Sequence, residues 1–165
     1  MKKIALIGFS ALLSMGTQAD VIRHALPNNN SFPIARAVEV TAGTTLIFHS
    51  GQVPGPANEK AEKGSAEYYG DTEAQAINIF KQFEASAKDL GVGFGDVVKM
   101  TAFIVGDPKQ GGKMDFDGFM RAYTKYFATK EQPNKPARSA FQIVGLAGGP
   151  NMLIEIEMII ARPKK

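Results

Sequence analysis

The segment Met152-Leu153-Ile154-Glu155-Ile156-Glu157-Met158-Ile159-Ile160-Ala161 is an apolar run interrupted by two carboxylates. In a β-strand, alternate side chains point to opposite faces, so this run predicts one face that is entirely apolar. Glu155 and Glu157 then share the other face with Leu153 and Ile159. Because unpaired carboxylates are costly to bury, that face either meets water or holds charge for a purpose.

The rest of the chain alternates strand and helix patterns. The expected elements are a hairpin of strands 37–41 and 45–50, a helix from about Asp71 or Thr72 to Leu90, a strand over 97–105, a helix over about 115–128, and strands over 139–144 and 152–161. Thr72 and Gln75 have the spacing of a capping box. The order β-β-α-β-α-β-β predicts an α+β fold with two helices on one face of a sheet. A short glycine loop joins the last two strands, which are therefore expected to be neighbours.

The first residues have the pattern of an export signal. Lys2 and Lys3 precede a short apolar stretch that ends at Ala19, which predicts a signal peptide over 1–19 and a single domain over 20–165. Cleavage would reduce the formal charge from +3 to +1, because it removes two lysines and no acid. The mature protein is expected outside the cytoplasm, in the periplasm or secreted, without a membrane anchor.

Composition argues against several classes of function. Basic residues are scattered rather than gathered in a stripe, so no nucleic-acid partner is expected. The chain has no cysteine, and His24 and His49 alone are too few to make a zinc site, so no metal is expected. The glycines of 91–95 follow a helix, which indicates a helix C-cap rather than a phosphate loop.

Arg138 stands where an extended loop enters a strand, in Pro136-Ala137-Arg138-Ser139. By residue type alone, a surface ion pair is one interpretation of such an arginine. A planar guanidinium can also bind a ligand carboxylate through two parallel hydrogen bonds, while a nearby glutamate positions a water molecule. The sequence leaves both interpretations open.

Several motifs resemble the RidA family, also called YjgF/YER057c/UK114, whose members include imine and enamine deaminases. The matching segments, in chain order, are Ser50-Gly51-Gln52-Val53-Pro54, Gln75, Gly95-Asp96-Val97-Val98-Lys99, Tyr123, Pro136-Ala137-Arg138-Ser139 and Ile154-Glu155-Ile156-Glu157. The resemblance covers about residues 33–162. It implies a chorismate-mutase-like α+β fold and a homotrimer with ligand clefts between subunits.

The resemblance also implies roles for particular residues. Arg138 would bind the substrate carboxylate and Glu155 would help water attack the imine carbon, with Glu157 left as a structural or interfacial charge. The implied reaction converts a 2-imino acid, or its enamine tautomer, to a 2-oxo acid and ammonia without a cofactor. The substrate-binding positions would be Ser50, Gly51, Ile34, Met120 and Ala140.

The chain departs from the family pattern at three of these positions. Ile34 stands where deaminase members usually carry tyrosine, Met120 where they often carry asparagine, and Ala140 where they usually carry cysteine. A more apolar pocket is expected, which suits either a larger hydrophobic imino acid or a binding protein for a carboxylated metabolite without turnover. Endoribonuclease activity, ascribed to some relatives, is a third reading that no histidine pair or basic stripe supports.

Overall fold

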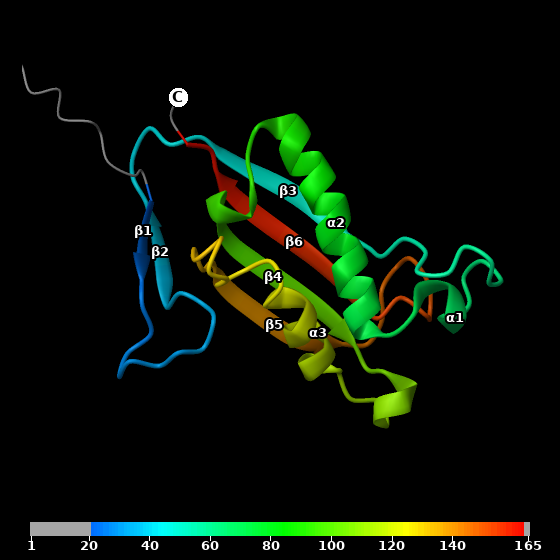
Figure 1. The fold of residues 1–165 in the computed structure, drawn as a ribbon. Coiled ribbons are helices and arrows are strands. Elements are labelled where there is room, and N and C mark those ends of the chain that lie inside the picture. The colour runs from blue at the N-terminus through cyan, green and yellow to red at the C-terminus, as the bar shows by residue number, and fades with distance from the viewer. Residues whose placement is uncertain (1–20, 164–165) are drawn as a thin grey trace, which may run out of the picture.

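The computed structural model describes residues 21–163, and the expected export signal lies outside them. The strands are β1 (Val21–His24), β2 (Ala37–Val40), β3 (Leu46–Gln52), β4 (Val97–Val105), β5 (Ala137–Ile143) and β6 (Ile154–Ala161). The helices are α1 (Ala66–Tyr69), α2 (Thr72–Leu90) and α3 (Phe116–Tyr123), with 3-10 turns at Phe94–Asp96 and Pro108–Gln110. Strands β1 and β2 form a separate antiparallel ribbon, and the other four form a sheet in the order β3-β6-β4-β5 (Figure 1).

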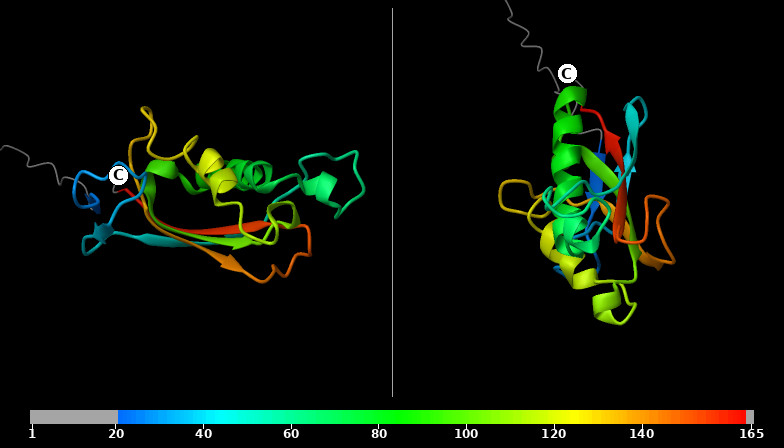
Figure 2. Two further views of the ribbon diagram at one scale, coloured as in Figure 1. Left: turned by 90° about the horizontal axis from the view of Figure 1, so that it is seen from below. Right: turned by 90° about the vertical axis from the view of Figure 1, so that its right-hand side faces the viewer.

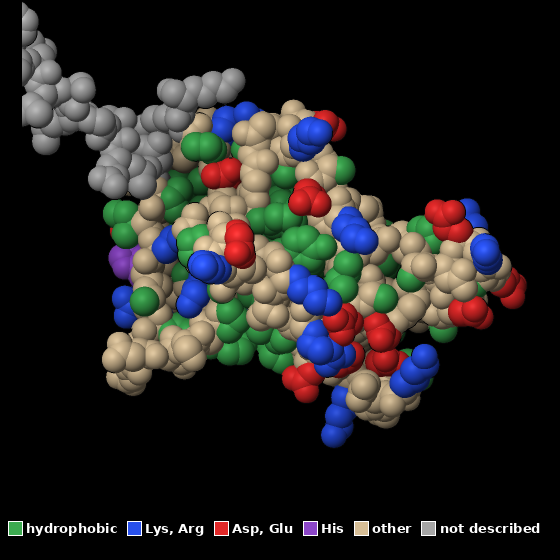
Figure 3. Space-filling view, viewed as in Figure 1, with side chains coloured by type: hydrophobic (Ala, Val, Ile, Leu, Met, Phe, Trp, Pro, Cys, Tyr) green, Lys and Arg blue, Asp and Glu red, His purple; other side chains and the backbone are tan. Residues whose placement is uncertain are grey.

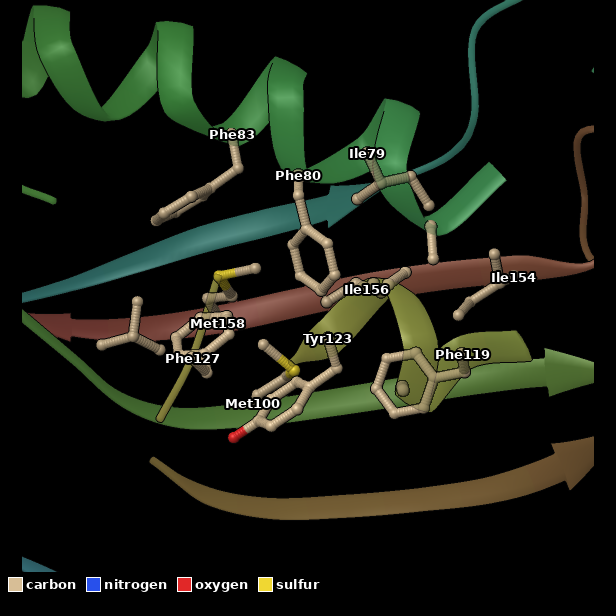
Figure 4. Close-up of a cluster of buried hydrophobic side chains, with 14 of the residues drawn as sticks. Ile79, Phe80, Phe83, Met100, Phe119, Tyr123, Phe127, Ile154, Ile156 and Met158 are labelled. Atoms are coloured by element: carbon tan, nitrogen blue, oxygen red, sulfur yellow. The ribbon is translucent and has the colours of Figure 1, made fainter. Parts of the chain in front are cut away.

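Two layers make up the body of the protein. Helices α2 and α3 lie on one side of the four-stranded sheet, and no helix of residues 21–163 covers the other side (Figure 2). Between the layers, Phe80 and Phe83 of α2 pack toward Ile156 and Met158 of β6, and all four are almost inaccessible to solvent (Figure 4). The expected α+β architecture is thereby confirmed.

Helix α2 ends where the sequence predicts, because its last turn is followed by Gly91 in the left-handed conformation, with φ of 67°. Its N-cap is Asp71, whose carboxylate accepts a hydrogen bond from the Ala74 amide at 2.8 Å. Gln75 does not complete a capping box. Its side chain is fully buried and accepts from the Leu153 amide at 2.7 Å, so it fixes the segment that leads into β6.

The expected hairpin of residues 37–41 and 45–50 is wrong. Strand β2 pairs with β1, and β3 pairs with β6, so the turn at Gly43 carries the chain from one sheet to the other. Residues 21–24 had no predicted structure, although they supply the strand that β2 requires. A turn signal between two strand patterns cannot show which edges the strands join.

The expected pairing of the last two strands is also wrong. Strand β5 runs parallel to β4 at one edge of the sheet, whereas β6 lies antiparallel between β3 and β4. The alternate residues Ile154, Ile156, Met158 and Ile160 are at most 3% exposed. This largely apolar strand takes a central place, where more of its surface is covered.

The helix expected over residues 115–128 begins as predicted but ends at Tyr123. Asp115 caps its start by accepting from the Gly118 amide at 2.8 Å. Beyond Thr124 the chain continues as turns, and Ala128 has φ of 58°, which no helix residue adopts. Phe127 is nevertheless fully buried, so the apolar spacing predicted which side chains are buried but not where the helix ends.

Candidate functional site

Arg138 is the second residue of β5, and its side chain faces the helices. In the parallel pairing it lies opposite Met100 of β4, which is fully buried beneath them. The distances from the guanidinium carbon to aromatic ring centroids are 4.3 Å for Tyr123, 5.0 Å for Phe119, 5.5 Å for Phe32 and 5.7 Å for Phe116. Each distance is short enough for a cation–π interaction.

The guanidinium of Arg138 lacks a counterion among residues 21–163. Its Nη1 atom is closed off from solvent and has no hydrogen-bond partner within that range. Burial lowers the pKa of Arg138 from its usual value, because desolvation disfavours the charged form. Buried charges in proteins are ordinarily paired, so this arrangement is suited to an anion that comes from outside the chain.

Arg23 shows how the same fold satisfies an arginine that serves the structure. Its guanidinium donates to the carbonyl oxygens of Val97 at 2.9 Å, Lys135 at 2.8 Å and Gly95 at 2.8 Å. These bonds tie β1 to the loops at one end of the sheet. The guanidinium of Arg138, the second residue of β5, is instead surrounded by aromatic rings, whereas that of Arg23 is surrounded by hydrogen-bond acceptors.

The ring of Tyr123 packs against the guanidinium of Arg138. Its ring lies closest to the guanidinium, and its hydroxyl donates to the Pro33 carbonyl at 2.7 Å. Burial raises the pKa of the Tyr123 phenol, although Arg138 acts in the opposite direction. The hydroxyl therefore keeps its proton and holds the segment around Pro33 against α3.

Glu155 lies on the opposite face of the sheet. Its partner in β4 is Phe103, three positions from Met100, and residues an odd number of positions apart in a strand point to opposite faces. Gly51 of β3 lies against it, since a Cβ added there would overlap the Glu155 carboxylate. Gly51 is therefore grouped with Glu155, and Ser50 precedes it in the same strand. A single chain does not bring Glu155 and Arg138 into one site.

The remaining predicted residues are divided in the same way. Met120 and Ala140 pack against the core on the helix side, together with Arg138. Ile34 lines a cavity of about 280 Å³ whose wall also includes Arg23 and Asn134. Phe32, two residues before Ile34, has its ring 5.5 Å from the Arg138 guanidinium carbon.

Glu157 lies on the uncovered face, opposite Thr101 of β4, and is exposed. It lines a hollow of about 130 Å³ with Phe48, Lys99 and Ile159. Lys99 donates to the Ser139 hydroxyl at 2.8 Å rather than to a carboxylate. The uncovered face therefore combines apolar side chains with a few unpaired charges.

Sequence reasoning missed three of the rings around Arg138. Phe116 and Phe119 belong to the stripe that predicted a helix, where apolar spacing does not distinguish core packing from a binding wall. Phe32 stands in a loop without periodicity, and only its position just before Pro33 could have marked it. The signal for all three would have been their place around the arginine, which depends on tertiary structure.

Residues 21–163 lack two other kinds of functional feature. That range holds no cluster of three or more His, Asp or Glu side chains suited to a metal ion. It also holds no helix that is long and apolar enough to cross a membrane.

Comparison with known proteins agrees with this fold. The family model described as Endoribonuclease L-PSP matches residues 27–162. A RutC family protein from Haemophilus influenzae is 28% identical over 130 residues, which cover 79% of this chain and 87% of that protein. The chain therefore belongs to the Endoribonuclease L-PSP family, the YjgF/RidA family of the sequence resemblance.

Two solved structures are informative relatives. The Rid family protein YyfB from Yersinia pestis superposes with a TM-score of 0.64 at 22% identity, covering 87% of this chain and all of that one, and shares the fold. E. coli TdcF with bound serine superposes with a TM-score of 0.55 at 27% identity, covering 75% of this chain and 85% of that one.

Proposed function

We propose that this protein hydrolyses 2-imino acids, or their enamine tautomers, to 2-oxo acids and ammonia after export from the cytoplasm. The observation that carries the proposal is the buried Arg138 guanidinium, which has no acceptor for Nη1 among residues 21–163. A ligand carboxylate would satisfy it through two parallel hydrogen bonds. TdcF, a relative, is bound to serine, an amino acid that bears a carboxylate.

The reaction needs little more than a positioned water and a protonated imine. With the carboxylate on Arg138, the C2 carbon of the ligand is an electrophile. Glu155 takes a proton from the attacking water as the C2–O bond forms, which gives a carbinolamine, and the Glu155 carboxyl then passes that proton to the nitrogen. As the hydroxyl proton moves to Glu155, the C2–N bond breaks and the C2=O bond forms, so ammonia and the 2-oxo acid are released; the ammonia then takes the proton from Glu155 and leaves as ammonium. No cofactor is required, because the imine already supplies the electrophile.

A second copy of the chain would complete the site. Arg138 and Glu155 lie on opposite faces of one sheet, so they can share a ligand only if different copies supply them. The uncovered face exposes large apolar side chains, with Phe48 74% and Phe141 44% exposed. Such a patch is typical of a protein interface. We therefore propose a homotrimer in which each cleft takes Arg138 from one copy and Glu155 from its neighbour.

A binding protein without turnover is the second candidate, and the apolar surroundings of Arg138 favour it. Endoribonuclease activity, which the family description carries, has less support. His24 of β1 is hydrogen-bonded to Glu39 of β2, whereas His49 of β3 is hydrogen-bonded to Ser86 of α2. The two histidines therefore do not form an acid–base pair. Acidic and basic side chains are interspersed on the helix side of the molecule (Figure 3).

The test uses imino acids generated in situ by an amino-acid oxidase, with semicarbazide to trap the imine that remains. Wild-type protein should accelerate formation of the 2-oxo acid, and Arg138→Ala should reduce the rate to that of buffer. Equal rates for wild type, variant and buffer would overturn the deaminase. Ligand binding by wild type alone would then favour the second candidate.

A mixing experiment tests the shared cleft. Arg138→Ala and Glu155→Gln should each be inactive, because each lacks one half of every site. Refolding the two variants together should restore about a quarter of the wild-type sites, since each site draws on two independently chosen copies. No recovery in mixed trimers, confirmed by light scattering, would refute the division of the site between copies.

A further inference from the structure

The surroundings of Arg138 also bear on which imino acid the site would accept. Phe32 is 38% exposed, and its ring lies 5.5 Å from the guanidinium carbon, so any ligand carboxylate bound there lies beside an accessible aromatic surface. Phe116 and Met120 are partly buried on the same side of the sheet. The groups nearest the carboxylate position are thus apolar, apart from Arg138 itself and the Tyr123 hydroxyl, which is already bonded.

We infer that the site selects 2-imino acids with large apolar side chains, such as those derived from leucine, methionine and phenylalanine, and that Phe32 is the wall that contacts the side chain. This inference rests on the proposed function. Phe32 lies in the loop before β2, at a position that sequence reasoning did not assign to the site.

The loop fixes the backbone of Phe32 before a ligand arrives. The Phe32 amide donates to the Asn30 side chain at 2.8 Å, and the Phe32 carbonyl accepts from the Ile34 amide at 2.8 Å. The next carbonyl, that of Pro33, accepts from the Tyr123 hydroxyl at 2.7 Å. Bonds on both sides of the residue fix the backbone, so a ligand would meet a preformed wall and lose less entropy on binding.

Selection follows from what different side chains would contact. A methyl group, as in the imine from alanine, extends too little to cover the Phe32 ring. A branched or aromatic side chain would cover it and remove apolar surface from water. A charged side chain would lose hydration without gaining a partner in this setting. Since one methylene in an apolar pocket changes selectivity by about 10-fold or more, the preference for the leucine-derived over the alanine-derived imine should be at least about 10-fold.

The experiment compares kcat/KM for imines generated by D-amino-acid oxidase from alanine, leucine, methionine and phenylalanine. Wild type should prefer the three larger substrates. Phe32→Ala should reduce that preference about 10-fold, chiefly by raising KM for the large substrates, because an apolar contact of this kind acts on binding. Phe32→Leu, which keeps an apolar wall, should retain most of the preference and serves as the matched control.

The outcomes separate this inference from the proposed function. Hydrolysis of none of the four imines by wild type would overturn both. Hydrolysis of all four at similar kcat/KM, or a preference for the alanine-derived imine, would overturn the inference and leave the deaminase intact. An unchanged preference in a folded Phe32→Ala variant would overturn the role of Phe32. If Phe32→Ala does not fold, Phe32→Gln takes its place: a reduced preference for the large substrates in that folded variant would support the wall, and an unchanged preference would overturn the role of Phe32. The wild-type ratio still decides the substrate class.

Discussion

Replacing Arg138 by methionine should stabilise the protein while greatly reducing its kcat/KM. The unpaired Nη1 atom costs about 1–3 kcal/mol of folding free energy. Contacts of the guanidinium with the aromatic rings offset about 0.5–2 kcal/mol of that cost. Methionine keeps an apolar stem against the same rings and gains about 0.3–1.5 kcal/mol from sulfur–aromatic contact. At the centre of these ranges the free energy of unfolding should therefore rise by about 1–2 kcal/mol, and Tm by up to about 6 °C.

Activity should fall although stability rises. Loss of two charge-assisted hydrogen bonds to the substrate carboxylate removes about 3–4 kcal/mol of binding, which is about 100- to 1,000-fold in kcat/KM. Thermal unfolding and urea titration measure the stability, and the semicarbazide assay measures the rate. Both are made at one protein concentration, because the proposed trimer links stability to assembly.

Arg23→Met is the matched control. It removes the same charge from another partly buried arginine, but one whose guanidinium bonds three carbonyl groups. Those acceptors would be left unpaired, so the variant should lose at least about 2 kcal/mol of stability. If Arg138→Met lowered Tm as much as Arg23→Met does, the guanidinium of Arg138 would be a structural element, and the reasoning that makes it a carboxylate clamp would fail.

Three further changes test the surroundings of the site. Gly51→Ala would push a methyl group into the Glu155 carboxylate, so the rate should fall with little change in Tm; an unchanged rate would mean that Glu155 is free to move aside. Tyr123→Phe removes the bond to Pro33 and should cost about 1 kcal/mol in a urea titration, whereas an unchanged midpoint would count against that bond as a clamp. Hydrogen bonds from Lys125, the larger cause, and from Arg121 lower the pKa of Glu73. Its ion pairs therefore stabilise the fold above the pKa of the unfolded state, and this stabilisation is lost as the pH falls. The Tm difference between wild type and Glu73→Gln should thus be present at pH 7 and shrink below about pH 4, and a difference that persists in acid would contradict this cause.

Local patterns determined which elements could be predicted. Helix α2 and strand β4 follow from periodicity and from their end signals within the same segment, and their bounds match. The partners of β2 and β5 could not be predicted, because a strand pattern carries no information on which edge it joins. The turn at Gly43 predicts a hairpin and the glycine loop after residue 144 predicts neighbouring strands, yet in the structure each of these strands pairs with a strand elsewhere in the sequence.

The site shows the same limit. Motifs located Arg138 and Glu155, yet their placement on opposite faces depends on the register of both strands against β4. The aromatic surroundings of Arg138 come from two segments, the loop before β2 and helix α3, which only the fold brings together. Sequence thus identified the groups that bear charge, and the structure revealed that they do not meet within one copy.

The position of β6 has a consequence for how the chain folds. The strand that is last in chain order lies between β3 and β4, so the sheet has a gap at its centre until residues 154–161 have arrived. Strand β3 then lacks a partner, β4 is paired only with β5, and the core beneath α2 lacks four of its most buried side chains. Stable tertiary structure must therefore wait for nearly the whole polypeptide, because the decisive pairing joins residues distant in sequence. Because folding is completed late, the chain would remain unfolded long enough to pass through a translocation channel, as the expected export signal would require.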